Sequence, residues 1–310
     1  MEKGNCRQAY GQTLMELGRS DGRIVVLEAD LGKSTMTCLF EREHPDRYFQ
    51  IGIAEQNMAS VAAGLALTGK TAFINSFAVF ASGRAYDQIR SSVCIPGLNV
   101  KVCGSSAGLS DFGDGKTHQS IDDIALMRVL PHMTVLSPVD SVETVQMVKA
   151  MCELNGPCYI RINRNDLPVY TSDCDEYHIG KMRMIRDGKD AAVFATGVMV
   201  SQAVKAAEEL ENDGVSVRVV NVSTIKPLDI EALKAYSAGM KGLVTAEEHS
   251  MYGGLGSAVC EALSAERTPV EILGINDSFG VSAENYEAIL ELFNLTPAAI
   301  ASRVKKVCKI

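Results

Sequence analysis

Short apolar runs of β-forming residues alternate with helical patterns along the chain, and this alternation constrains the fold most strongly. Runs such as Ile24–Ala29, Ala72–Ser76 and Val100–Gly104 are mostly apolar and do not alternate strictly between apolar and polar residues. Strands buried on both faces have this composition, and helices between them provide the crossovers of a parallel sheet. We therefore predict an α/β fold whose mostly parallel sheets are flanked by helices.

The alternation lapses once, in a polar stretch before Asp190, and then resumes. A chain of 310 residues is long enough for two domains of ordinary size. We predict a first domain over residues 1–170, a linker over 171–189 and a smaller α/β domain over 190–310. The tail Asn285–Lys306 is predicted to be helical and to dock on the second domain.

Composition and charge argue against several classes of function. The net charge of -8, with scattered Lys and Arg, argues against a nucleic-acid surface. No apolar run is long enough to span a bilayer, so we expect no membrane segment and a cytoplasmic location. The nine cysteines form no CxxC pair and are expected to be core thiols of a reducing compartment. The histidines show no metal-ligand spacing, so no metal site is predicted on this chain.

Glu55 stands at the junction of two apolar segments. It follows Phe49–Ile53, which is predicted as a buried strand, and precedes a small-residue helix predicted over Asn57–Thr68. A carboxylate buried there destabilises the fold unless a partner pairs with it, and a ligand that needs a buried acid would explain it. A carboxylate near a helix N-terminus can also serve only the helix dipole. For Glu55 taken alone, that second explanation is the commoner one.

A glycine-rich segment, Cys103–Gln119, follows a predicted strand and carries four glycines, two aspartates and His118. Glycine allows the backbone to approach a ligand closely, and loops after parallel strands are where α/β sheets build their sites. Turns use the same residues, and an isolated histidine is more often structural. The segment by itself therefore leaves both interpretations open.

Taken together, the segments resemble the C-terminal half of transketolase. The resemblance rests on GIAEQNM around Glu55, the aromatic run Phe77–Phe80, GDGKTHQ, RINRN and EEHSMYGGLGSAV at Glu247–Val259. It covers essentially the whole chain and implies a pyrimidine-binding domain of a thiamine diphosphate enzyme, followed by a transketolase C-terminal domain. The implied reaction transfers a two-carbon ketol unit from a ketose to an aldose, each carried as a sugar phosphate.

The resemblance also implies a partner. Full-length transketolases carry an earlier domain whose GDG-plus-Asn signature holds the diphosphate through a divalent metal. The GDG at Gly113–Gly115 runs directly into KTHQ instead. We therefore expect one subunit of a split enzyme, inactive alone. An N-terminal transketolase subunit would hold Mg²⁺ or Ca²⁺ and the diphosphate in an α2β2 assembly.

The resemblance assigns roles around the cofactor. Glu55 would share a proton with N1′ of the aminopyrimidine, which promotes the imino form that removes the C2 proton of the thiazolium ring. Phe80, with Phe77 beside it, would stack on the pyrimidine ring. Asp30 would lie near the cofactor at the subunit interface. His118 would assist proton transfer and stabilise the charged intermediate.

Substrate contacts are implied in the same way. Asp114 would contact a hydroxyl of the donor sugar. Arg7, Ser34 and Arg164 would bind the sugar phosphate, because guanidinium groups bind phosphate in a bidentate manner. Surface ion pairs are the structural alternative for these arginines, and the neighbouring Arg161 has a similar claim to phosphate. Ser106 occupies a position where transketolases usually carry a donor-contacting histidine, which suggests an unusual donor.

Two rival functions share this domain arrangement. One is the E1 β subunit of a 2-oxoacid dehydrogenase, which would not need a sugar-phosphate pocket. The other is a non-catalytic regulatory subunit, which would show no dependence on thiamine diphosphate even when the partner is supplied. GDGKTHQ and the arginines favour transketolase over the first rival, and the presence of both Glu55 and His118 argues against the second.

Overall fold

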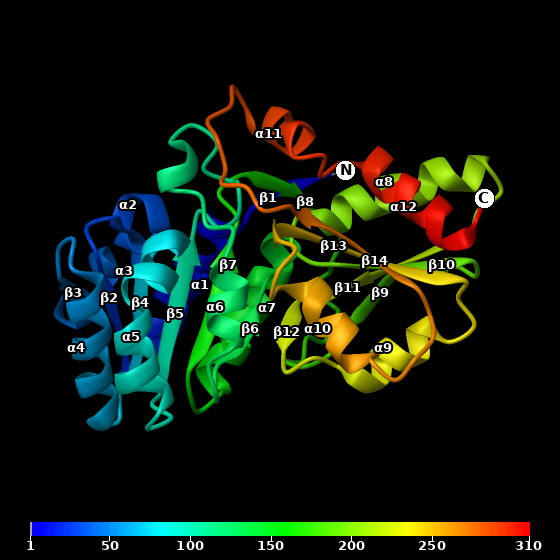
Figure 1. Ribbon diagram of the computed structural model, residues 1–310. Helices are drawn as coiled ribbons and strands as arrows, with labels where there is room; N and C mark the ends of the chain where they lie inside the picture. Colours follow the sequence, from blue (N-terminus) through cyan, green and yellow to red (C-terminus); the bar gives the residue numbers. More distant parts are fainter. Residues whose placement is uncertain (1) are drawn as a thin grey trace.

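The apolar runs of the first half form one large, mostly parallel sheet in the computed structural model, which describes residues 2–310 (Figure 1). Every neighbouring pair is parallel except β12 with β6. In spatial order the strands are β12 (Thr224–Lys226), β6 (Thr134–Leu136), β7 (Cys158–Ile162), β5 (Val100–Ser105), β4 (Thr71–Phe77), β2 (Ile24–Glu28) and β3 (Tyr48–Gln50).

Helices bury both faces of this sheet, which explains why its strands are mostly apolar. Successive side chains of a strand point to opposite faces. Accordingly, Ile24 and Val26 belong to one apolar cluster, and Val25 and Leu27 belong to another. The first cluster includes residues of α1 (Cys6–Ser20), α3 (Cys38–Glu43) and α7 (Ser141–Glu153). The second includes residues of α4 (Glu55–Leu67) and α6 (Asp123–Arg128), with α5 (Tyr86–Gln88) packed against it.

The strand predicted at Phe49–Ile53 is wrong in both extent and burial. β3 ends at Gln50, and Ile53 is 75% exposed. β3 lies at the edge of the sheet and pairs only with β2. Gly52 then turns the chain with a φ of +77°, a conformation that glycine adopts without strain. The apolar residues after Gln50 therefore leave the sheet instead of extending it.

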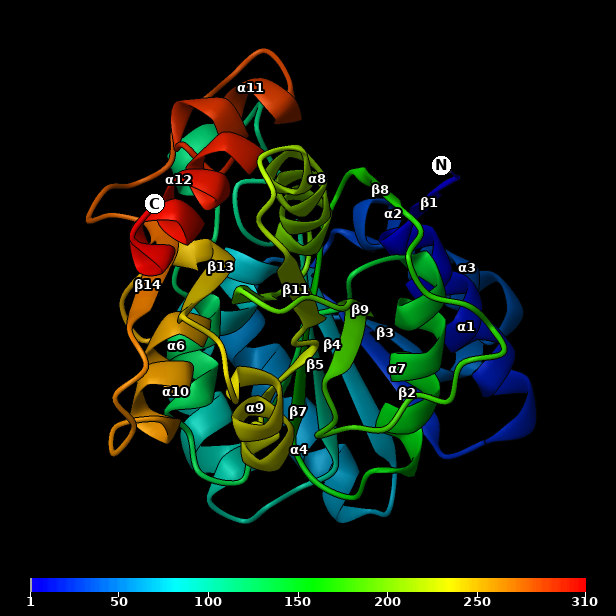
Figure 2. The same cartoon turned by 90° about the vertical axis from the view of Figure 1, so that its right-hand side faces the viewer.

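A second sheet follows the order β14-β13-β10-β11-β9, in which only β9 is antiparallel to its neighbour. Helices α8 and α12 cover one face, and α9 and α10 cover the other (Figures 1 and 2). The strands are β9 (Arg183–Arg186), β10 (Ala191–Ala195), β11 (Val217–Asn221), β13 (Gly242–Ser250) and β14 (Val270–Ile275). The helices are α8 (Met199–Asn212), α9 (Ile230–Ser237), α10 (Leu255–Ala262) and α12 (Pro297–Cys308).

The two sheets are more closely joined than the expected boundaries imply. The expected linker 171–189 contains β9, and the expected second domain supplies β12 to the first sheet. One apolar cluster includes Ile24 and Met147 from the first unit and Val193 and Val219 from the second. β9 could not be predicted from the polar sequence of 171–189. It is an edge strand, and because one of its sides stays in contact with solvent it does not need an apolar sequence.

Smaller elements complete the chain. The predicted helical tail is interrupted between two helices, α11 (Tyr286–Leu292) and α12, which pack against the shared cluster. A short antiparallel pair joins β1 (Lys3–Asn5) to β8 (Asp166–Pro168), and α2 (Gly32–Thr35) follows β2.

Three expectations about composition can be compared with the described residues. Within 2–310, no helix has the length and apolar character to cross a membrane. The cysteines are all free, and most are buried or partly buried, although Cys174 is exposed. Among the same residues, no group of three or more His, Cys, Asp or Glu side chains could hold a metal ion.

Candidate active site

The predicted site residues lie on loops at one edge of the first sheet, where the carboxyl ends of its parallel strands meet. Asp30 follows β2, Phe80 follows β4, His118 follows β5 and Arg164 follows β7. In open α/β sheets, ligands bind at this edge. The topology therefore places segments that are distant in sequence along one rim.

Glu55 is the first residue of α4 and is 1% exposed. Ser76 Oγ donates to Glu55 Oε1 at 3.3 Å, and Arg84 Nη1 lies 2.9 Å from Glu55 Oε2. The buried acid is therefore paired within its own chain, by a cation that the sequence analysis did not connect with it. The first-turn position adds a favourable interaction with the helix dipole.

Arg84 comes from a π-helical turn, Val79–Arg84, which follows β4. Wide turns of this kind occur mostly at functional sites. The Arg84 guanidinium lies 4.5 Å from the centroid of the Phe80 ring, and its side chain is 45% exposed. One half-exposed cation thus contacts both the buried carboxylate and the aromatic face beside it.

Phe77, Phe80 and His118 form an aromatic cluster next to this ion pair. The two phenylalanine rings are stacked, with centroids 6.3 Å apart. The His118 ring meets Phe80 edge-on at 5.5 Å and Phe77 at 6.1 Å. The structure therefore brings together Glu55 and the three rings that the resemblance groups around a cofactor. This aromatic cluster offers a flat apolar face between an acid and an imidazole, which suits a heteroaromatic ring.

Asp30 lies on the same rim but apart from the aromatic cluster. Its backbone is left-handed, with a φ of +63°, and its N–H donates to Gln50 Oε1 at 2.8 Å. The residues that the structure describes contribute no ion pair to Asp30. Glu28, two positions earlier, is fully buried and accepts from Thr35 and Thr37 at 2.8 and 2.6 Å. Burial raises the pKa of Glu28 to about 7.

Arg7 and Arg164 converge at a second point of the rim. Arg164 Nη1 lies 2.7 Å from Asp111 Oδ2, and Arg7 Nη1 donates to the Ser34 carbonyl at 3.1 Å. Arg7 Nε is buried and has no hydrogen-bond partner among residues 2–310. Burial and the charge of Arg164 together lower the pKa of Arg7. Arg164 is paired with Asp111, whereas Arg7 has no carboxylate ion pair among the described residues. The Arg7 guanidinium could therefore accept an anion as an additional partner.

The remaining predicted substrate residues differ in accessibility. Asp114 is exposed, just before a short 3₁₀ turn at Gly115–Thr117. Ser106 is fully buried in a left-handed conformation, and neither its hydroxyl nor that of Ser105 has a protein partner. Ser34 reaches Arg7 through its backbone carbonyl rather than its hydroxyl.

Arg161, which the sequence analysis considered as a possible phosphate-binding residue, has a structural role instead. Its Nε and Nη2 donate to the two carboxylate oxygens of Asp123 at 2.9 and 3.0 Å, and its side chain is 5% exposed. Tyr159 Oη donates to the same carboxylate at 2.7 Å. β7 is buried on both faces, so every side chain on it lies in the interior, including that of Arg161. Arg161 is therefore part of a buried ion pair and not of the anion pocket.

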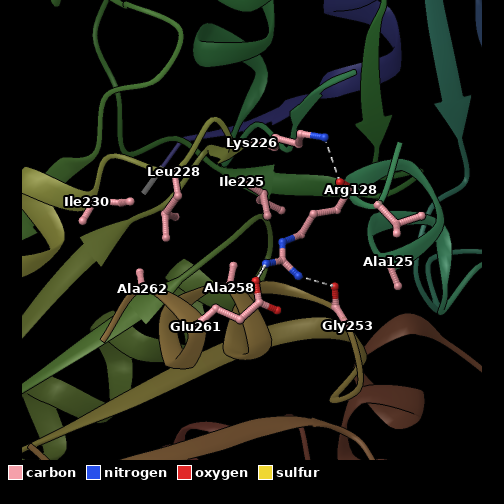
Figure 3. Close-up of a pocket in the computed structure, with 11 residues that line it drawn as sticks. Ala125, Arg128, Ile225, Lys226, Leu228, Ile230, Gly253, Ala258, Glu261 and Ala262 are labelled. Atoms are coloured by element: carbon pink, nitrogen blue, oxygen red, sulfur yellow. Dashed lines mark hydrogen bonds and ion pairs between the residues drawn. The ribbon is translucent and has the colours of Figure 1, made fainter. Parts of the chain in front are cut away.

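A cavity of ≈ 730 Å³ lies elsewhere, at the seam between the two units (Figure 3). Arg128 in its wall pairs with Glu261 and donates to the Gly253 carbonyl at 3.3 Å. Lys226 donates to the Arg128 carbonyl at 2.9 Å. Its charged groups are thus already paired within the chain, and it shares no residue with the aromatic cluster. We assign this cavity to domain packing.

Comparison with known proteins agrees with this architecture. The model of the transketolase pyrimidine binding domain matches residues 2–169, and that of the transketolase C-terminal domain matches residues 180–300. A Methanocaldococcus jannaschii protein, provisionally named as a transketolase C-terminal section, is 42% identical over 307 residues, which is 98% of this chain and 96% of that protein. The 6-deoxy-6-sulfo-D-fructose transketolase subunit of Clostridium sp. (strain MSTE9) is 41% identical over 310 residues, covering 99% of this chain and 95% of that subunit.

A solved structure agrees over the full length. A split-gene transketolase, described as an inactive beta4 tetramer, has a TM-score of 0.90 at 44% identity and covers 99% of both chains. The two sheets and the site at the strand ends thus define a two-domain α/β protein whose first domain has the thiamine-diphosphate-binding fold. The chain belongs to the transketolase family, as the sequence resemblance predicts.

Proposed function

We propose that this chain is the C-terminal subunit of a split transketolase. It would transfer a two-carbon ketol unit between sugars, together with an N-terminal subunit. The observation that carries the proposal is the buried Glu55 carboxylate beside the Phe77, Phe80 and His118 rings. Residues 1–170 would supply the pyrimidine side of the site, and residues 190–310 would form the C-terminal domain.

The residues of the rim fit the pyrimidine half of thiamine diphosphate. The Phe80 face can stack on a ring, and Glu55 Oε1 has only one long hydrogen bond, from Ser76 at 3.3 Å. When bound, thiamine diphosphate supplies the electron sink for transfer of the two-carbon unit. Glu55 would hold a proton at the pyrimidine N1′, and His118 would move a proton at the substrate oxygen. Asp30 would face the partner near the cofactor.

We propose that the partner holds the diphosphate and its divalent metal, Mg²⁺ or Ca²⁺. The names of the relatives support two subunits, since one of them is a transketolase subunit and another is a C-terminal section. Purified chain alone is expected to be inactive, and addition of the N-terminal subunit with thiamine diphosphate and Mg²⁺ should yield ketol transfer in an α2β2 assembly. Activity on pyruvate with lipoamide instead would favour the 2-oxoacid dehydrogenase alternative. Absence of any thiamine diphosphate dependence would favour a regulatory subunit.

The substrate would be a ketose with an anionic end. Arg7 and Arg164 would bind that group, Asp114 would contact a donor hydroxyl, and Ser34 and Ser106 would lie near the sugar. A phosphate and a sulfonate both fit a pair of guanidinium groups. The relative that acts on 6-deoxy-6-sulfo-D-fructose shows that a transketolase subunit of this length can serve a sulfonated sugar. A donor screen with matched phosphate, sulfonate and uncharged sugars distinguishes these classes.

Arg164→Gln is expected to raise the KM for the anionic sugar about 10- to 100-fold, because a hydrogen bond to a charged group contributes about 1.5–3 kcal/mol. The kcat should change little, since Arg164 does not contact the reacting carbons. Steady-state kinetics with the anionic donor and its uncharged analogue test this. Arg19→Gln, which removes an exposed cation of the first domain, is the matched control. Equal KM changes for both donors would contradict the assignment.

Arg84→Gln is expected to tighten thiamine diphosphate binding to the two-subunit enzyme about fivefold. The pyrimidine ring needs the Glu55 carboxylate and the Phe80 face, and Arg84 contacts both. Arg84 is the half-exposed partner of this ion pair. Its ion pair and its cation–π contact together contribute about 1 kcal/mol, and the cofactor no longer has to displace them in the variant. Isothermal titration calorimetry measures the change, with Arg90→Gln as the control. Weaker binding in Arg84→Gln would show that Arg84 holds the cofactor instead.

A further inference from the structure

The loop that carries Asp114 and His118 is held by its own domain at its base and at Ser110 and Asp111. Ala107 N–H donates to the Ile162 carbonyl at 3.1 Å. Gly108 and Ser120 exchange backbone hydrogen bonds of 2.9 and 3.0 Å. These contacts close the loop. Further along, in its outer part (residues 109–119), Asn165 Nδ2 donates to the Ser110 carbonyl at 3.1 Å and Arg164 Nη1 donates to Asp111 Oδ2 at 2.7 Å. For residues 112–119, the hydrogen bonds to other described segments come from the second domain.

The second domain contacts this outer part near both of its ends. Near the start, the Leu109 N–H donates to Glu248 Oε1 at 2.9 Å. Beyond it, the Ala283 N–H donates to the Phe112 carbonyl at 2.9 Å. At the end, Gln119 Nε2 donates to the Val281 carbonyl at 2.9 Å. Figure 1 shows the segment before α11 lying over the loop that follows β5.

Glycines allow this close approach. Gly108 has a φ of +66°, and a Cβ there would collide with the Glu248 carboxyl group. A Cβ at Gly280 would collide in the same way with the side chain of Gln119. The two domains are therefore in direct contact beside His118, with no room for an intervening side chain.

Glu248 is the polar centre of this contact. It is 4% exposed and also accepts from Tyr286 Oη at 2.9 Å and from Asn163 Nδ2 at 3.4 Å. A buried carboxylate that accepts from several donors has one preferred orientation. A donor beside it that is left without an acceptor lowers the stability of the fold. Burial raises the pKa of Glu248 to about 7.

The neighbouring Glu247 shows that this role is specific. Successive residues of a strand point to opposite sides. Glu247 accepts from the N–H groups of Leu255 and Gly256 at 2.7 and 2.8 Å, at the start of α10 within its own domain. Both acids are buried, and burial raises both pKa values to about 7. Only Glu248 reaches the loop of the first domain.

We infer that Glu248 is a positioning residue, through which the C-terminal domain fixes the loop that bears Asp114 and His118. The inference deepens the proposed function, since the importance of His118 rests on that proposal. The C-terminal domain thereby acts on the site without contacting the substrate. Glu248 sets the start of the loop, and the segment 281–283 sets its middle and end.

Hydrogen exchange of the full chain at pD 8 tests this positioning without any turnover. Leu109 N–H and Tyr286 Oη share Glu248 Oε1 as acceptor, and Asn163 Nδ2 uses Oε2. In Glu248→Gln, one of these two oxygens becomes an NH₂ donor, and the loss of the negative charge weakens the hydrogen bonds to the oxygen that remains. Exchange of amides in 106–119 is expected to accelerate about tenfold, which corresponds to the loss of one buried hydrogen bond. The control Glu247→Gln should accelerate exchange at 254–262 and leave 106–119 unchanged.

Kinetics of the two-subunit enzyme provide the second readout. Glu248→Gln should lower kcat and raise the KM for the sugar, whereas Glu247→Gln should lower only the fraction of folded enzyme. Tyr286→Phe removes one donor and should give a smaller acceleration of loop exchange, which keeps the test available if Glu248→Gln does not fold. Unchanged exchange in 106–119 in either folded variant would overturn the inference. A wild type without transferase activity would overturn the proposed function and leave the exchange result standing.

Discussion

Glu55→Gln in the assembled enzyme is expected to reduce the rate of ketol transfer by about 10²–10⁴-fold, the usual contribution of a positioned proton-transfer group. Glutamine keeps the shape of the side chain and can still bond to Ser76 and Arg84, but it cannot exchange a proton. Binding of thiamine diphosphate should change much less than turnover, because stacking on Phe80 is retained. Single-turnover kinetics together with calorimetric titration of the cofactor separate the two effects.

The matched control for this prediction is Glu43→Gln, which removes a partly exposed carboxylate paired with Arg19. It should retain the activity of the wild type. If Glu55→Gln also turned over at nearly the normal rate, the buried acid would have only a structural role at the start of α4. The proposed chemistry would then have to be abandoned.

Arg161→Met is expected to destabilise the folded chain by about 3–5 kcal/mol, the usual effect of removing one partner of a buried ion pair. Asp123 is fully buried, and after the substitution only the Tyr159 hydroxyl would remain among its side-chain donors. Denaturant unfolding monitored by circular dichroism measures the change. The result also tests the correction made above, because a phosphate-binding arginine at the surface would show almost no effect on stability.

Arg161→Met combined with Asp123→Leu provides the comparison. The double variant removes the stranded charge and should recover part of the lost stability, because apolar replacements of buried pairs are often tolerated. Arg186→Met, which breaks an exposed pair with Glu211, should cost well under 1 kcal/mol. If the double variant were less stable than Arg161→Met alone, the ion pair would not be the source of the destabilisation.

Much of the architecture follows from the sequence. The apolar composition of β2, β4, β5 and β10 predicts buried parallel strands, and those strands form the centres of the two sheets. Elements at the margins of the sheets were harder to predict. β9 and β12 are short edge strands with one unpaired side, so their sequences carry little of the apolar signal on which the prediction depends.

The candidate site was predictable as a set of residues but not as a set of pairings. The resemblance proposes Glu55, Phe80 and His118 as site residues, and the structure places the three side chains close together. Arg84 was missed as the partner of Glu55, because the π-helical turn that directs it inward has no clear sequence pattern. Arg161 and Arg164 look equivalent in sequence. Arg161 lies within the buried strand β7, whereas Arg164 lies beyond the end of that strand, where its side chain is accessible.

β12, the strand that the second half of the chain contributes to the first sheet, has a consequence for how this protein can be divided. It pairs with β6 at the margin of the first sheet, although its residues come long after that domain has ended in sequence. A fragment cut at residue 170 would therefore leave β6 with a bare hydrogen-bonding edge, together with half of an apolar cluster open to water. A chimera that joins the first domain of one related subunit to the C-terminal domain of another brings in new residues at 224–226. These residues must then pair with β6 of the recipient, and chimeras in which they do not match β6 should aggregate.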